Sequence, residues 1–367
     1  MTSTASEARA RGDALFLLPS AVMGGAEKVL RIAAETAARS GRFATVRVFV
    51  LAGEPSDATR ALDATDGIEV EHGLAASEIA GLPRLVRALA RKRYAFVMST
   101  HAHLNAAASA ARRAGILRTD RLVTRESTMV FERDFGWTSP LIRSLVRLYG
   151  AQDAIVCQTT RMAETLGVHT GGRLADRTVR IPNPIELRPE PVRAHPGVAP
   201  RIAWCGRICA QKAPERALAV LAALRRDGLD ATMVMMGDGE LRGSMEALAA
   251  TLDIVEHVEF TGRISRPVER MRECDIGLMT SNLEGFPNVL LEMLAAGIPR
   301  VVTTDCAGDL DLVPGTTVVS SRDVDHLAQA VRTALDEPLA GPEHEAAIAA
   351  CLAERSPEAF LESLLAA

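Results

Sequence analysis

The sequence predicts an α/β protein of two domains, each built around a parallel sheet. Its 367 residues exceed what a single hydrophobic core usually holds. Short apolar segments alternate with longer segments of helical periodicity along both halves, which is typical of parallel α/β folds. A dense run of prolines between residues 181 and 200 interrupts this pattern, because proline continues neither a helix nor a central strand.

Each expected strand in the first half is a short apolar run. The strand candidates are 15–18, 46–51, 96–98, 122–123 and 154–157. A helix is expected to begin near Gly25, directly after the first strand, and to stop at Ser40-Gly41, because glycine commonly follows the last turn of a helix.

The second half repeats the same alternation after the proline-rich linker. Its strand candidates are 201–204, 231–236, 258–260, 276–279, 300–303 and 317–319. The last segment opens with Ser-Pro-Glu, which suits a helix N-terminus. We therefore expect an N-terminal domain over residues 1–183, a second domain over 184–350, and a C-terminal helix within 351–367 that returns to the first domain.

Several protein classes are excluded by composition. No apolar run is long enough to cross a bilayer, and residues 1–13 lack the apolar core of an export signal, so we expect a cytoplasmic chain. Six cysteines in so long a chain do not form a disulfide scaffold. The composition, 48% hydrophobic and 24% charged, is that of a globular protein.

Charge is unevenly distributed between the halves. The formal net charge is +7 over residues 1–180 and −11 over residues 181–367. The basic half either meets an anionic partner or is an ordinary solvated surface. Two stretches, 82–93 and 137–149, combine apolar positions at helical spacing with basic residues, as membrane-surface helices and ordinary surface helices both do. For the first we hypothesise contact with an anionic membrane through Arg84, Arg87, Arg91, Lys92 and Arg93, and we expect no nucleic-acid partner.

Polar signals of the second half follow expected strands, where open α/β sheets bind ligands. Gly206-Arg207 comes after the strand at 201–204, with Lys212 five residues further on. Arg207 and Lys212 can neutralise a diphosphate, while Gly206 lets the main chain approach it. Gly237-Asp238-Gly239 and Gly262-Arg263 follow two later strands and fit phosphate, sugar or base contact.

The segment 284–292 is the most informative. Glu284 lies on a glycine-containing turn, a helix is expected to begin near Asn288, and Glu292 lies one turn inside it. A helix N-terminus offers N–H groups and a positive dipole end to a phosphate. Two carboxylates beside that phosphate can accept hydrogen bonds from hydroxyl groups on either side, which matches a nucleotide sugar.

These motifs, taken in order, resemble glycosyltransferase family 4. Besides Glu284-x7-Glu292 and the glycine motifs, Met23-Gly24-Gly25 resembles the family's loop after its first strand. Ser99-Thr100-His101 lies where the family often has an active-site histidine, and Ile181-Pro182-Asn183 resembles its interdomain segment. The resemblance implies a GT-B fold, in which two Rossmann-like domains face each other across a cleft, and retaining transfer of a hexose-type sugar from a nucleotide sugar.

The resemblance also implies a role for each matching residue. Arg207 and Lys212 would hold the donor diphosphate, Glu292 the ribose, and Glu284 the sugar hydroxyls. Main-chain groups of Phe286, Asn288 and Val289 would contact sugar or phosphate, and those of Arg263 the base. The donor site would be lined by Gly206, Gly237, Asp238 and Gly262. The first loop, with Gly24 and Gly25, would approach the donor phosphate or the acceptor. His101 would contact the transferred sugar. Many members have glycine where this chain has Pro287, which has no N–H to donate, and this departure bears on donor choice.

The implied chemistry needs no metal and no cofactor. Arg207, Lys212 and the helix start supply positive ends for the leaving nucleoside diphosphate, with retention by substitution on one face of the sugar. Four pairs of possible metal ligands are interpreted as caps, surface groups or core positions instead. These pairs are Asp309-x-Asp311, Asp323-x-Asp325, His101-x-His103 and Cys205-x3-Cys209. We expect a UDP-sugar as donor and, as acceptor, a saccharide or lipid-linked intermediate of cell-surface polysaccharide or lipopolysaccharide, met by a cytoplasmic enzyme on the inner face of the membrane.

Three alternatives remain open, and a fourth lacks its motif. A nucleotide-sugar epimerase of the same fold would act without an acceptor. A GDP-mannose-dependent mannosyltransferase would differ in its donor, and a nucleotide-sugar-binding subunit would lack turnover. A dinucleotide dehydrogenase would need Gly-x-Gly-x-x-Gly after the first strand, which Met23-Gly-Gly-Ala-Glu-Lys does not supply.

Overall fold

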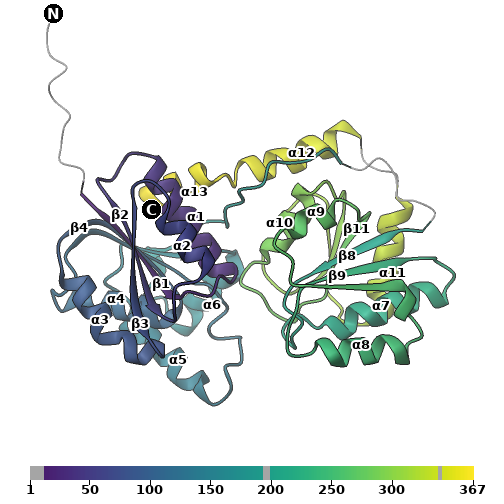
Figure 1. Cartoon of the computed structure of the whole chain (residues 1–367), viewed down its shortest axis with the longest axis horizontal. Coiled ribbons are helices and arrows are strands. Elements are labelled where there is room, and N and C mark those ends of the chain that lie inside the picture. The colour runs from purple at the N-terminus through teal and green to yellow at the C-terminus, as the bar shows by residue number, and fades with distance from the viewer. Residues whose placement is uncertain (1–11, 193–198, 338–340) are drawn as a thin grey trace, which may run out of the picture. The chain divides into compact units, whose positions relative to one another are not determined.

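Two compact units make up the chain, seen in a computed structural model (Figure 1) that describes residues 12–192, 199–337 and 341–367. Unit 1 comprises Met1–Pro184 and Ser356–Ala367, and unit 2 comprises Ile185–Arg355. Most of the segment inspected for an export signal and part of the proline-rich linker, 193–198, lie outside the described residues.

Unit 1 contains a seven-stranded sheet in the order β3-β2-β1-β4-β5-β6-β7, with all neighbours parallel. Its strands are β1 (Ala14–Ser20), β2 (Val46–Ala52), β3 (Ile68–Ala75), β4 (Tyr94–Thr100), β5 (Thr119–Arg125), β6 (Ala154–Cys157) and β7 (Thr178–Arg180). Its helices are α1 (Gly25–Arg39), α2 (Asp57–Asp63), α3 (Glu78–Ala90), α4 (Ala102–Arg113), α5 (Ser139–Leu145), α6 (Thr160–His169) and α13 (Pro357–Ala366), with 3₁₀ turns η1 (Gly136–Thr138), η2 (Val146–Leu148) and η3 (Ala175–Arg177).

Alternation along the central strand β1 builds one core on each face of this sheet. Phe16 and Leu18 pack with α1, and Leu15 and Leu17 pack with α3 and α4. Helix α13 joins the first of these cores through Phe360 and neighbouring leucines, so the C-terminal segment packs on α1 within unit 1.

Unit 2 contains a six-stranded parallel sheet in the order β10-β9-β8-β11-β12-β13. Its strands are β8 (Arg201–Cys205), β9 (Thr232–Met236), β10 (Val258–Gly262), β11 (Ile276–Met279), β12 (Val301–Thr304) and β13 (Thr316–Val319). Its helices are α7 (Pro214–Arg226), α8 (Arg242–Thr251), α9 (Pro267–Met271), α10 (Asn288–Ala295), α11 (Val324–Asp336) and α12 (Pro342–Ala353), with the 3₁₀ turn η4 (Val255–His257). Helices α7, α8 and α11 cover one face, and α9, α10 and α12 pack on the other.

The predicted fold class is confirmed: both halves are parallel α/β units, and every expected strand is present. The structure adds β3 and β7, which we did not predict. In the described ranges no helix combines the length and the apolar character that crossing a bilayer requires.

Each sheet has one point at which the strand order reverses, between β1 and β4 in unit 1 and between β8 and β11 in unit 2. Connections from the two strands at such a point run to opposite faces of the sheet, which leaves a crevice at their carboxyl ends where α/β proteins bind ligands. The loops that follow these four strands contain Gly24-Gly25, His101, Gly206–Lys212 and Glu284. The fold therefore places the most informative sequence motifs at its two expected ligand-binding edges.

Candidate functional site

The centre of the unit 2 site is a contact between the two loops at its reversal point. Lys212, from the loop after β8, places Nζ 2.6 Å from Oε1 of Glu284, from the loop after β11. The exposed fraction is 22% for the Lys212 side chain and 11% for that of Glu284, so the pair is shielded but still reached by solvent. Two residues to which the resemblance gives different parts of the donor thus bind each other.

A hydrogen-bond network fixes the two loops against each other. Gln211 donates through Nε2 to the carbonyl of Leu283 at 2.9 Å, and the amide of Asn282 donates to the carbonyl of Gln211 at 2.8 Å. The Thr280 hydroxyl donates to the carbonyl of Ala213 and accepts from the indole of Trp204. This buried network sets the position of the Lys212–Glu284 pair before any ligand binds.

Glycines allow the loops after β8 and β9 to touch through their main chains. Gly237 has φ +138°, and a Cβ there would collide with the carbonyl oxygen of Gly206. A Cβ on Gly239 would collide with the carbonyl of Ile208. The amide of Ile208 donates to the carbonyl of Asp238 at 3.0 Å, so this close approach is a real pairing of the two loops. Larger residues at either glycine would separate them.

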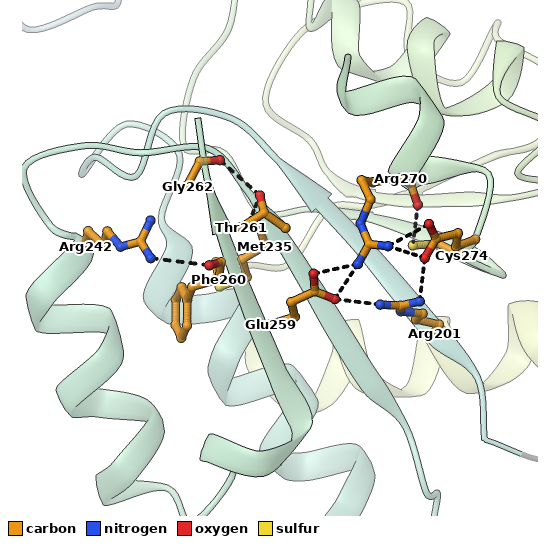
Figure 2. A network of polar contacts seen from close by, with 10 residues as sticks. Arg201, Met235, Arg242, Glu259, Phe260, Thr261, Gly262, Arg270 and Cys274 are labelled. Carbon is orange, nitrogen blue, oxygen red and sulfur yellow. Dashed lines mark hydrogen bonds and ion pairs between the residues drawn. The ribbon is translucent and has the colours of Figure 1, made fainter. Parts of the chain in front are cut away.

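The end of β10 supplies Gly262 and Arg263. Figure 2 shows Glu259, the second residue of β10, bound by both Arg201 and Arg270. The ion pairs measure 2.6 Å to Arg201 and 2.5 Å to Arg270. Further along, the Thr261 hydroxyl donates to the carbonyl of Gly262 at 3.0 Å. Gly262 has φ +69° and its carbonyl accepts from the amide of Gly237, so the β10 end is tied to the β9 loop while Arg263 is exposed beside it.

Helix α10 begins at Asn288, as predicted, and has no side-chain cap. Its N-cap residue is Pro287, which lacks an N–H, and no acidic side chain occupies its first turn. Phe286 is buried, whereas Asn288, Val289 and Glu292 are half-buried. A helix start without a side-chain cap, next to Glu284, directs the positive end of its dipole toward an anion at this place.

Arg207 differs from Lys212 in being exposed. In the ranges that the structure describes, its guanidinium makes no ion pair with a carboxylate. The site thus holds one paired cation and one that is open to an incoming anion.

In unit 1, the loop after β1 contacts the loop after β4 through Glu27. Gly24 is the N-cap of α1, and its amide donates to Oε2 of Glu27 at 3.1 Å. A Cβ on Gly24 would lie 2.8 Å from the same oxygen, so a larger residue would displace it. Oε1 of Glu27 lies 3.4 Å from Nε2 of His101, the N-cap of α4. Gly25 opens α1 directly beside this contact.

His101 is held in an unusual state. Its φ of +69° is rare for a residue with a side chain and marks stored backbone strain. Burial first, and then the charges of His103, Arg125 and Arg133, lower the pKa of His101 to about 3. The imidazole is therefore neutral at physiological pH, available for hydrogen bonds to hydroxyl groups rather than for ion pairing.

A buried charged cluster lies behind His101, and sequence reasoning missed it. Arg125 is fully buried at the end of β5 and donates to Oδ1 of Asn183 at 2.6 Å; burial lowers its pKa to about 10. The adjacent Glu126 accepts from Tyr149 and Asn105 at 2.7 and 2.9 Å, while its burial raises its pKa. The available signal was the polar triplet Thr-Arg-Glu directly after an apolar strand.

None of the described residues form a cluster of three or more His, Cys, Asp or Glu side chains suited to a metal ion. Asp323 caps α11 through the amides of Asp325 and His326, which confirms its interpretation as a helix cap.

The fold and the site together define a protein of the GT-B class. The whole chain superposes on Anabaena HepE in complex with UDP with a TM-score of 0.75 at 16% identity, covering 96% of this chain and 98% of that one. The lipopolysaccharide outer core galactosyltransferase WaaB gives the same score, identity and coverage. At this identity the likeness concerns the fold.

The comparisons confirm the resemblance to glycosyltransferase family 4 that the sequence motifs carry. The family model "Glycosyl transferases group 1" matches residues 199–337, within unit 2. A GDP-mannose-dependent α-(1-6)-phosphatidylinositol dimannoside mannosyltransferase of Mycobacterium tuberculosis is 31% identical over 198 residues, 51% of this chain and 50% of its own length. The glycogen synthase of the same species is 29% identical over 219 residues, 57% of this chain and 53% of its own. The chain thus matches about half the length of these curated relatives.

Proposed function

We propose that the protein is a retaining glycosyltransferase that moves a hexose-type sugar from a nucleotide sugar to a saccharide or lipid-linked acceptor. The observation that carries this proposal is the Lys212–Glu284 pair at the reversal point of the second sheet, beside the exposed Arg207 and the uncapped start of α10. A diphosphate and a polyol have complementary partners in this arrangement.

The donor half of the reaction uses the groups of unit 2. Arg207, Lys212 and the N–H groups at the start of α10 stabilise negative charge that develops on the departing nucleoside diphosphate. Glu284 and Glu292 accept hydrogen bonds from sugar and ribose hydroxyls. No step in this scheme requires a metal, so we expect turnover to continue in excess EDTA.

The donor is proposed to be a UDP-sugar, in line with the UDP that the structural neighbour HepE binds. GDP-mannose is the alternative, supported by the printed donor of the mycobacterial relative. Pro287 removes one main-chain donor from the sugar-binding turn, and this difference from many family members affects which sugar is accepted.

The acceptor is proposed to bind unit 1, at the carboxyl edge that holds Gly24, Gly25 and His101. A neutral histidine beside a carboxylate suits hydroxyl groups. An intermediate of cell-surface polysaccharide or lipopolysaccharide fits a basic N-terminal half, with the protein acting on the cytoplasmic side and bound peripherally to the membrane.

A thermal-shift panel of UDP-, GDP- and ADP-sugars tests donor binding, because a ligand that binds only the folded state raises the melting temperature. Product analysis then separates the candidate functions. Conversion of donor alone to an isomeric nucleotide sugar supports an epimerase, and donor binding without transfer to any acceptor supports a non-catalytic subunit. Strict dependence on Mg²⁺ contradicts the metal-free scheme.

A further inference from the structure

The segment between β5 and β6 of unit 1 exposes an apolar stripe to solvent. Trp137 is 92% exposed and Leu141, one helical turn further, is 63% exposed. Leu148 continues the stripe at a spacing of seven residues, and Ile116, which follows α4, is also exposed. The segment consists of η1, α5 and η2, and α5 lies at the rim of unit 1 in Figure 1.

This stripe is not the side by which the segment packs on the protein. Ser139, Val146 and Tyr149 are the buried positions of the segment, and α4 is the helix packed against it. A surface helix normally presents polar residues opposite its packed side. Here tryptophan and leucine occupy that side, so the segment is apolar both toward the core and toward solvent.

Uncompensated positive charge surrounds the stripe. Among the described residues, four arginines of this region form no ion pair with a carboxylate; they are Arg113, Arg143, Arg147 and Arg173. Arg113 and Arg173 instead donate to the carbonyl of Tyr149, and Arg143 donates to that of Arg133, so their charges are not neutralised.

The acids of the region do not reverse this balance. Glu132 is paired with Arg161 at 2.6 Å, and Asp153 is paired with Arg112 at 2.5 Å. Asp134 accepts hydrogen bonds from the Gly136 amide and the Ser139 hydroxyl, which are neutral, so its one negative charge stands against the four arginines. The surface around the stripe therefore carries a net positive charge.

The basic stretch on α3 is a weaker candidate for the same role. Arg91 pairs with Glu71, Lys92 with Asp13, and Arg93 with Asp120. Arg84 donates to the carbonyl of Gly73 and keeps its charge, so Arg84 and Arg87 are the two cations of that hypothesis that form no ion pair in the described ranges. Most of its charge is already balanced within the protein.

We propose that the Trp137 face, formed by Ile116, Trp137, Leu141 and Leu148 with the four arginines, is a docking surface for an anionic lipid bilayer. Tryptophan and leucine enter the boundary between headgroups and acyl chains, while the arginines meet lipid phosphates. Charge complementarity and the exposed indole favour a lipid surface over a protein partner. The proposal rests on the peripheral membrane binding of the proposed function and names the surface that makes it. Because vesicle binding needs no sugar nucleotide, the proposal can fail independently of the transfer reaction.

The test uses the full chain and vesicles of phosphatidylcholine with or without phosphatidylglycerol, without donor or acceptor. The protein has two tryptophans, and Trp204 is buried with its indole bonded to Thr280. The difference in emission between wild type and Trp137→Phe therefore reports Trp137. We expect flotation with anionic vesicles at low salt, a blue shift of the Trp137 emission, and its quenching by lipids brominated near the headgroup.

Variants then locate the surface. Trp137→Ser with Leu141→Ser, and separately Arg143→Glu with Arg147→Glu, should each lower partitioning by about tenfold or more at unchanged melting temperature. Val255→Ser, an exposed apolar residue of unit 2, is the matched control and should not change it.

Three outcomes overturn the proposal. Wild type that does not float at low salt lacks the surface altogether. If the protein floats but Trp137 is not quenched, or if flotation is lost only in the variant Arg84→Glu with Arg87→Glu, the bilayer binds at α3 instead. Equal binding to zwitterionic and anionic vesicles removes the role of the arginines.

Discussion

Nζ of Lys212 lies 2.6 Å from Oε1 of Glu284, across 72 residues of sequence and between the two loops at the reversal point of the second sheet. The pair keeps a carboxylate and an ammonium shielded from solvent without leaving either one alone, which would be costly. In the proposed reaction, a donor diphosphate that binds beside Lys212 would share an ammonium that Glu284 already orients. Glu284 would in turn accept hydrogen bonds from hydroxyl groups of the sugar.

Replacing either partner should reduce both stability and activity. In Lys212→Ala the carboxylate of Glu284 loses its cation, which costs about 1–3 kcal/mol of folding free energy, and the diphosphate loses a positive contact. We expect kcat/KM to fall by about a hundredfold or more. Arg226→Ala, which removes an exposed cation of α7, is the control and should leave both quantities unchanged.

The double variant Lys212→Met with Glu284→Gln separates the two contributions. It removes both charges, so the melting temperature should recover while activity stays low. Recovery of activity as well would mean that Lys212 serves only to neutralise Glu284, contrary to the proposed diphosphate contact.

Arg207→Ala should affect the donor without affecting the fold. The side chain is exposed and makes no ion pair within the described residues, so its removal leaves no buried charge. We expect an unchanged melting temperature without ligand, and a donor dissociation constant raised about tenfold, measured by calorimetry. Donor affinity equal to wild type would remove Arg207 from the site.

Close approach of the β8 and β9 loops should make Gly237 and Gly239 intolerant of alanine. Gly237 has a positive φ, and a Cβ at either position meets a carbonyl oxygen. We expect Gly237→Ala to lower stability by about 2 kcal/mol or more and to weaken donor binding. Gly243→Ala is the matched control, because its Cβ meets nothing within 4 Å and alanine is the better helix former in α8. If all three variants melted like wild type, the loops would not be packed as described.

Much of the fold could be predicted from the sequence, and the exceptions have physical reasons. Buried parallel strands such as β9 and β11 are continuous apolar runs, which stand out from the helices around them. Strand β3 was missed because Glu69 and Glu71 interrupt it at the sheet edge, where one side faces solvent, and β7 because it has only three residues.

The residues of the candidate site could be named from sequence motifs, but the contacts between them could not. In the sequence, Lys212 and Glu284 follow different strands. They come together only because β8 and β11 are neighbours in the sheet. The cluster of Arg125 and Glu126 was missed because charged residues after a strand are normally read as solvated. Their burial depends on covering side chains such as Tyr149, which come from distant parts of the chain.

His101 should make the protein less stable at acidic pH. Its pKa is about 3 in the folded protein against about 6.5 when unfolded, so between these values the unfolded state binds one more proton. The neutral imidazole therefore supports the fold fully above pH 6.5, and this support is lost progressively as the pH falls toward 3. Denaturation at a series of pH values should show a shallower loss of stability in His101→Gln than in wild type. Because Glu27, His103, Arg125 and Arg133 face His101 in both proteins, the difference between the two curves isolates the imidazole.

The same shift keeps His101 neutral from pH 5 to 8, so the pH profile of transfer should show no limb that disappears in the variant. Parallel stability curves, or an activity limb near pH 6.5 abolished by His101→Gln, would show that His101 titrates as an exposed histidine does.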